Sequence, residues 1–169
     1  MIYIMRLIHI VGGVLWVGGA VITAAFFVPS VRAAGPAGAP VMQQLVQVRK
    51  LPIFFIGTGF LTILSGISLY WRASGGFSNG WMQSGVGMTF GVGGLCALIA
   101  LLIGLIVAAP AGKRAGELGA QIASAGKPPT PEQMAEMQRL SARTGKAGAW
   151  AGVFLLLAAA AMSVARYVA

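Results

Sequence analysis

The chain has 169 residues, of which 57% are hydrophobic and only 9% are Asp, Glu, Lys or Arg. A soluble domain carries roughly a quarter charged residues, so the composition excludes a soluble enzyme, a disordered tail and a disulfide scaffold. A helix needs about 20 apolar residues to cross a bilayer. Four stretches of this length or longer lack charges entirely, namely 7–31, 51–71, 73–112 and 147–165. The sequence therefore predicts a polytopic membrane protein.

The first predicted helix covers about 3–28 and is expected to stop at Pro29. We interpret it as a retained helix, because its uncharged run is too long for a signal-peptide core and lacks a small-residue cleavage site. Pro36 and Pro40 are expected to keep the next stretch in loops, followed by a short amphipathic turn over 41–48.

The second predicted helix covers about 51–71, with Pro52 tolerated in its first turn. A connection rich in Gly, Ser and Asn over 72–80 predicts a tight turn between antiparallel helices. The third helix is expected over 81–109, ending before Pro110.

A polar region follows, and within it Thr130-Pro131-Glu132-Gln133 is typical of a helix start. Three apolar side chains then recur at a three-residue spacing: Met134, Met137 and Leu140. They predict a short amphipathic cytoplasmic helix over about 131–144, continuing with a bend near Gly145 into the fourth membrane helix at 147–168. The fold class is thus all-α, an antiparallel bundle of four transmembrane helices in a single membrane domain, 1–169.

Orientation is predicted from the basic residues, because cytoplasmic loops of membrane proteins are enriched in Lys and Arg. The connections at 28–50 and 110–146 hold Arg32, Arg49, Lys50, Lys113, Arg114, Lys127, Arg139, Arg143 and Lys146. The opposite side has only Arg6, Arg72 and Arg166. We therefore expect a protein of the bacterial inner (plasma) membrane, with the long connections cytoplasmic and both termini outside.

Small residues are expected to pack the helices, because lipid offers no hydrophobic drive for helix pairing. Gly87 and Gly91 have the spacing that allows backbones to approach closely, and a polar stripe follows one face of the second helix: Thr58, Thr62 and Ser65.

The only histidine, His9, lies in the first predicted helix, and a histidine inside a bilayer marks a candidate functional site. It is the candidate axial haem ligand and metal ligand. Met88 lies in the same outer half, and Arg6, Arg72 and Arg166 could pair with haem propionates. The competing interpretation is that His9 only hydrogen-bonds a Thr or Ser across a helix interface.

Other chemistries find less support in the sequence. No recognition motif or aromatic-interleaved basic face indicates nucleic-acid binding. Eight Met and one Cys could bind copper, but Met134 and Met137 fit an apolar helix stripe better, and Cys96 cannot form an intrachain disulfide.

The run Met5-Arg6-Leu7-Ile8-His9-Ile10, followed by Trp16-Val17-Gly18-Gly19, resembles the first helix of HemJ-type protoporphyrinogen oxidases and CopD-type copper-resistance proteins. The resemblance implies a four-helix membrane protein that binds haem b, with His9 as the functional histidine. HemJ-type enzymes also rely on a lysine soon after a Gly-Trp pair. Here Gly80-Trp81 is followed by no lysine in the third helix, so the resemblance implies haem binding more directly than oxidase activity.

Three functions thus remain open from the sequence. The first is a haem- or porphyrin-binding membrane protein. The second is a non-catalytic subunit of a larger respiratory or photosynthetic complex, and the third is a small copper or solute transporter. The lipid bilayer is the expected partner in each, with a homo-oligomer or a larger membrane complex also possible.

Overall fold

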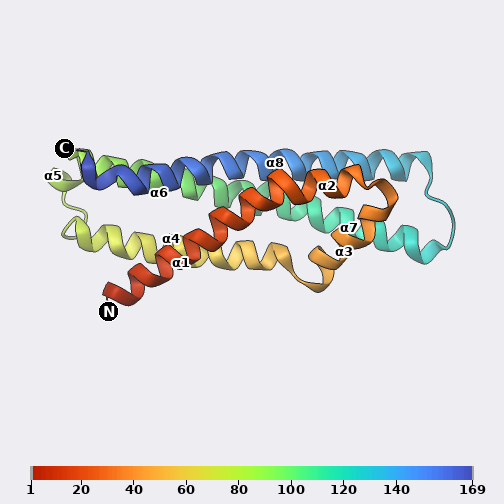
Figure 1. Ribbon diagram of the computed structural model, residues 1–169, viewed down its shortest axis with the longest axis horizontal. Coiled ribbons are helices and arrows are strands. Elements are labelled where there is room, and N and C mark those ends of the chain that lie inside the picture. The colour runs from red at the N-terminus through yellow and green to blue at the C-terminus, as the bar shows by residue number, and fades with distance from the viewer. Residues whose placement is uncertain (1, 169) are drawn as a thin grey trace.

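A computed structural model describes residues 2–168, which form a bundle of long helices (Figure 1). Four helices are long and apolar enough to cross a membrane: Ile2–Ala33, Leu51–Ala73, Gly85–Ala125 and Pro131–Tyr167. Residues 2–168 contain no strand, which confirms the predicted all-α, membrane-embedded bundle.

In chain order the elements are α1 (Ile2–Ile22), η1 (Thr23–Phe27), α2 (Val28–Ala33), η2 (Gly35–Ala37), α3 (Gly38–Gln43), η3 (Gln44–Val48), α4 (Leu51–Ala73), α5 (Asn79–Met82), α6 (Gly85–Ile103), η4 (Gly104–Ala108), α7 (Ala109–Ala125), α8 (Pro131–Val164) and η5 (Ala165–Tyr167). Ile2 and Val168 lie at one end of the molecule, called here the terminal end, and the turn between α7 and α8 marks the opposite hairpin end (Figure 1).

The expectation that the first helix stops at Pro29 is wrong. Proline lacks an N–H and its ring clashes with the carbonyl four residues back. The π-helical segment η1 immediately precedes it, and the Val28 N–H donates to the Thr23 carbonyl, five residues back. This wider turn accommodates the proline, so the helix continues to Ala33.

The same arrangement overturns the predicted helix end before Pro110. Here η4 supplies the wide turn, with the Ala109 N–H donating to the Gly104 carbonyl. The helix runs without interruption from Gly85 to Ala125, 41 residues or about 62 Å at 1.5 Å per residue. A bilayer core is roughly 30 Å thick, so α7 projects well beyond it.

The helix-start motif at Thr130 is confirmed, and so is the expected continuation of the helix over 131–144 into the fourth membrane helix. The Thr130 hydroxyl accepts from the Gln133 N–H at 3.3 Å, and the Gln133 side chain accepts from the Thr130 N–H at 2.9 Å. From there α8 runs unbroken for 34 residues, past Gly145. Gly126, with φ of 59°, ends α7 in the left-handed conformation that favours glycine. The predicted polar connection is therefore a long helical hairpin.

Two shorter expectations also change. The stretch after α2 is mostly helical rather than loop, with Pro40 in the first turn of α3, where a missing N–H costs little. The third membrane helix begins at Gly85 instead of 81, because Ser84 caps it: the Ser84 hydroxyl accepts from the Gly87 N–H at 3.1 Å.

The most extensive helix pairs are α6 with α8 and α1 with α4, and α1 also packs on α8. The buried core lies where α1, α6 and α8 meet: Trp16, Ala97, Ala100, Leu101, Leu155 and Ala158. On α6 the close approach to α8 occurs at Gly93, where an added Cβ would lie 3.3 Å from the Ala158 carbonyl oxygen. Gly87 and Gly91 instead face Trp81 and Tyr70.

Candidate cofactor site between α1 and α4

The α1–α4 interface alternates small and large side chains along an antiparallel pair. On α1, an added Cβ on Gly19 would lie 2.9 Å from the Phe55 ring, and an added Cβ on Gly12 would lie 2.8 Å from the Thr62 hydroxyl. On α4, an added Cβ on Gly59 would lie 3.0 Å from the Trp16 ring. Each glycine on one helix thus receives a side chain from the other. This matching sets the register that brings His9 opposite Gly66.

His9 is held by a hydrogen bond to the backbone of α4. Its Nδ1 lies 2.8 Å from the Thr62 carbonyl oxygen, and a carbonyl only accepts, so Nδ1 carries the proton. The imidazole rests on Gly66, where an added Cβ would lie 2.8 Å from His9 Cε1. The interpretation that His9 bonds across a helix interface is confirmed, although the acceptor is a backbone carbonyl rather than a hydroxyl.

The second ring nitrogen, Nε2, remains free. It has no hydrogen-bond partner among residues 2–168. Every buried side-chain nitrogen and oxygen in that range has a partner, so Nε2 is not completely buried. In the neutral ring that Nδ1 donation defines, Nε2 carries the lone pair. Nε2 is therefore the ring nitrogen of His9 that could ligate a metal ion.

The hydroxyls of the polar stripe on α4 are satisfied by their own helix. Thr58 donates to the Phe54 carbonyl at 2.8 Å and Thr62 to the Thr58 carbonyl at 2.8 Å. Ser65 donates to the Leu61 carbonyl at 2.5 Å, and its hydroxyl also lies 3.1 Å from the Thr62 carbonyl oxygen, which accepts from His9. The stripe thus serves as a smooth packing face for α1 and supplies the acceptor for His9.

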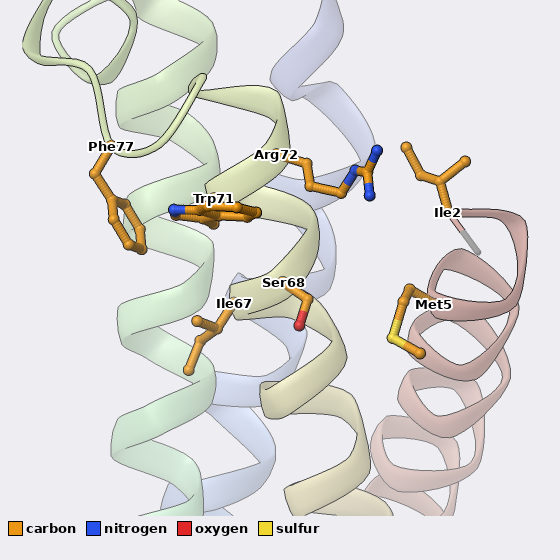
Figure 2. Close-up of a pocket in the computed structure, with 7 residues that line it drawn as sticks. All are labelled: Ile2, Met5, Ile67, Ser68, Trp71, Arg72 and Phe77. Atoms are coloured by element: carbon orange, nitrogen blue, oxygen red, sulfur yellow. The ribbon is translucent and has the colours of Figure 1, made fainter.

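An open cleft of about 300 Å³ lies toward the terminal end, beyond His9 on the same helix pair (Figure 2). Seven residues line it: Ile2, Met5, Ile67, Ser68, Trp71, Arg72 and Phe77. Figure 2 shows the Met5 thioether and the Arg72 guanidinium extending into the space between α1 and α4. Met5 precedes His9 by four residues and so shares its helix face. The cleft is apolar, with a single cation at its rim.

The structure does not gather all the residues that the sequence singled out. Met88 is 55% exposed on α6, a helix that packs mainly on α8 and α4 rather than on α1. Arg6 and Arg166 are exposed, and neither lines the cleft. The cation beside the cleft is Arg72, the third of the arginines that the sequence placed at the outer mouth as candidate propionate partners.

Thr62, Gly66 and Ser68 were missed as site residues. The sequence did carry a signal for Thr62 and Gly66. One face of α1 repeats at spacings of four, three and four residues: Met5, His9, Gly12 and Trp16. One face of α4 repeats at spacings of three and four residues: Gly59, Thr62 and Gly66. Antiparallel pairing of these two patterns would have placed Gly66 against His9.

No group of three or more His, Cys, Asp or Glu side chains within residues 2–168 is arranged to hold a metal ion. Any metal at His9 would therefore need further ligands from a cofactor. The chain matches no protein-family model, and neither a curated protein nor a solved structure proves similar to it.

Proposed function

We propose that this membrane protein binds haem b or a related porphyrin, with His9 Nε2 as the axial ligand. The observation that carries the proposal is the hydrogen bond from His9 Nδ1 to the Thr62 carbonyl. Histidines that ligate metals commonly donate their other ring N–H to a carbonyl or carboxylate, which orients the ring and raises the basicity of the ligating nitrogen.

The cleft lies beyond His9 on the same helix pair and is not lined by it, and its residues fit such a group in their chemistry. Met5 and Ile67 offer an apolar wall, and Arg72 offers a guanidinium suited to a propionate carboxylate. The cleft volume of about 300 Å³ lies at the lower end of the range for ligand pockets. The chain would therefore enclose only part of a tetrapyrrole, with the remainder facing lipid or another subunit.

Bound haem would supply an iron centre capable of one-electron exchange. The chain's own contribution is to hold and orient His9, to exclude water with apolar helices, and to neutralise a carboxylate through Arg72. No carboxylate side chain lies on the charge-free runs of the four long helices, since all three acidic residues fall within 110–146. The protein therefore fits electron transfer or porphyrin handling better than acid–base catalysis.

The second axial position has no imidazole from the same chain, because His9 is the only histidine. We therefore expect five-coordinate iron in the isolated chain. A six-coordinate spectrum would instead indicate a ligand from a second copy or from a larger membrane complex.

The test is an absorbance spectrum of the protein purified in mild detergent and titrated with haem. We expect a Soret band that His9→Ala removes and that added imidazole restores in the variant, because free imidazole can replace a missing ligand. Met88→Leu is the control and should keep the band. A wild-type protein that takes up no haem would refute the proposal, as would a Soret band unchanged in His9→Ala.

For the location we propose the bacterial inner membrane, with the hairpin end in the cytoplasm and both termini outside. Nine of the twelve Lys and Arg residues support this orientation by lying on the connections at the hairpin end.

A further inference from the structure

At the hairpin end, Arg32 extends from the end of α2 onto the surface of α8. Its Nη2 donates to the Ser141 carbonyl at 2.8 Å. The guanidinium also fills the space beside Gly145, where an added Cβ would collide with it. A guanidinium has five N–H donors, so this contact positions the group while leaving most of its donors free.

The cations around Arg32 lack acidic partners. The chain has three carboxylate side chains. Glu117 pairs with Lys113, and Glu136 pairs with Arg114 and Arg139. The third, Glu132, lies at the start of α8. On the hairpin side, five basic residues form no salt bridge among residues 2–168 and border the ends of the apolar spans: Arg32, Arg49, Lys50, Arg143 and Lys146. They form a positively charged rim where three of the membrane helices leave the bilayer.

A shallow cavity of about 360 Å³ lies beside the Arg32 guanidinium. It is lined by Arg32, Met137, Gln138, Ser141 and Ala142. The α8 part of this lining precedes the apolar run that begins at Ala147, so the cavity lies at the level of lipid headgroups rather than of acyl chains. Its chemistry combines one fixed cation with a small amphipathic surface.

We propose that this cavity binds the headgroup of an anionic phospholipid from the adjacent leaflet. The lipid phosphate accepts hydrogen bonds from the free N–H groups of Arg32, and the rest of the headgroup lies over Gln138 and Ser141. The unpaired cations of the rim favour a lipid with net negative charge, and they disfavour a zwitterionic lipid because its ammonium group is repelled.

The experiment compares the thermal stability of the purified protein in detergent after adding phosphatidylglycerol or phosphatidylcholine. We expect phosphatidylglycerol to raise Tm more than phosphatidylcholine does. Arg32→Gln should lose most of this difference. Lys127→Gln removes the same charge at the distant α7–α8 turn and should keep the difference.

Gly145→Ala is the second variant, which keeps every charge but displaces the guanidinium from α8. Because the colliding atoms are the far end of a flexible side chain, the fold should tolerate it, and it decides the question if Arg32→Gln does not fold. Equal effects of the two lipids on the wild type would overturn the proposal. It would also be overturned if both Arg32→Gln and Gly145→Ala kept the full lipid difference, or if inorganic phosphate reproduced the rise in Tm.

Discussion

At the scale of single residues, the α1–α4 interface shows how a glycine on one helix makes room for a side chain of the other. His9 can reach the Thr62 carbonyl only because Gly66 leaves room for the imidazole. Trp16 is buried in the core only because Gly59 receives its ring. In both cases the glycine is required for its small volume, since both residues are in ordinary helical conformation.

The substitution Gly66→Ala tests this arrangement. The new Cβ would lie 2.8 Å from His9 Cε1, so the ring must move and the hydrogen bond to Thr62 should weaken. Overpacking of this kind costs about 1–3 kcal/mol of stability. We expect a lower Tm and weaker haem retention, measured on the same purified sample. Gly57→Ala on the same helix is the control, because no atom lies within 4 Å of its added Cβ. Equal behaviour of the two variants would contradict the assigned packing.

At the scale of elements, two prolines at which the sequence predicts helix ends lie inside continuous helices. Pro29 and Pro110 each follow a π-helical turn whose last N–H reaches five residues back. The consequence is greatest for α7, because the continuous helix carries it out to pair with the polar half of α8. Across this pair, Glu136 lies 3.5 Å from Arg114 and accepts a 2.8 Å hydrogen bond from Arg139.

Protonation of Glu136 should loosen this hairpin. The hydrogen bond from Arg139 lowers the pKa of Glu136 below its ordinary value of 4.5, against partial desolvation, and the charges of Arg139 and Arg114 lower it further. A lowered folded-state pKa means that the stabilisation is present above the ordinary value and is lost as pH falls through the folded-state value.

The variant Glu136→Gln reproduces the uncharged state at neutral pH. We expect faster tryptic cleavage within the hairpin than in the wild type, with an effect limited by the exposure of these groups. Glu117→Gln is the matched control, since its ion pair with Lys113 lies within α7. If the two variants were cleaved equally fast, the Arg114–Glu136 pair would have no role in holding the hairpin together.

At the scale of the whole molecule, charge and shape divide the protein into two unequal ends. The terminal end carries the cleft and three arginines, whereas the hairpin end carries all three acidic residues and nine of the basic ones. The proposed cofactor site and the proposed lipid site thus lie at opposite membrane surfaces, and each can be altered independently of the other.

The proposed orientation can be tested with single cysteines, because Cys96 is the only native one. In a Cys96→Ala background, Ser78→Cys reports on the terminal end and Lys127→Cys on the hairpin end. A membrane-impermeant maleimide added to spheroplasts should label Ser78→Cys at once and Lys127→Cys only after lysis. The reverse labelling pattern would show that the protein has the opposite orientation in the membrane.

The sequence alone determined that this is an all-α membrane protein with four spans. Charge-free runs of 19 or more residues and their basic flanks depend only on local composition, and so does the Thr130 cap. The continuation of the helices through Pro29 and Pro110 could not be predicted in the same way, because it depends on the π turn that precedes each proline. Likewise, His9 was identifiable as a lone polar residue in an apolar helix. Its contact residues Thr62 and Gly66 lie more than fifty residues away, and although their spacing on α4 matches that of α1, only the packed register of the two helices brings them to His9.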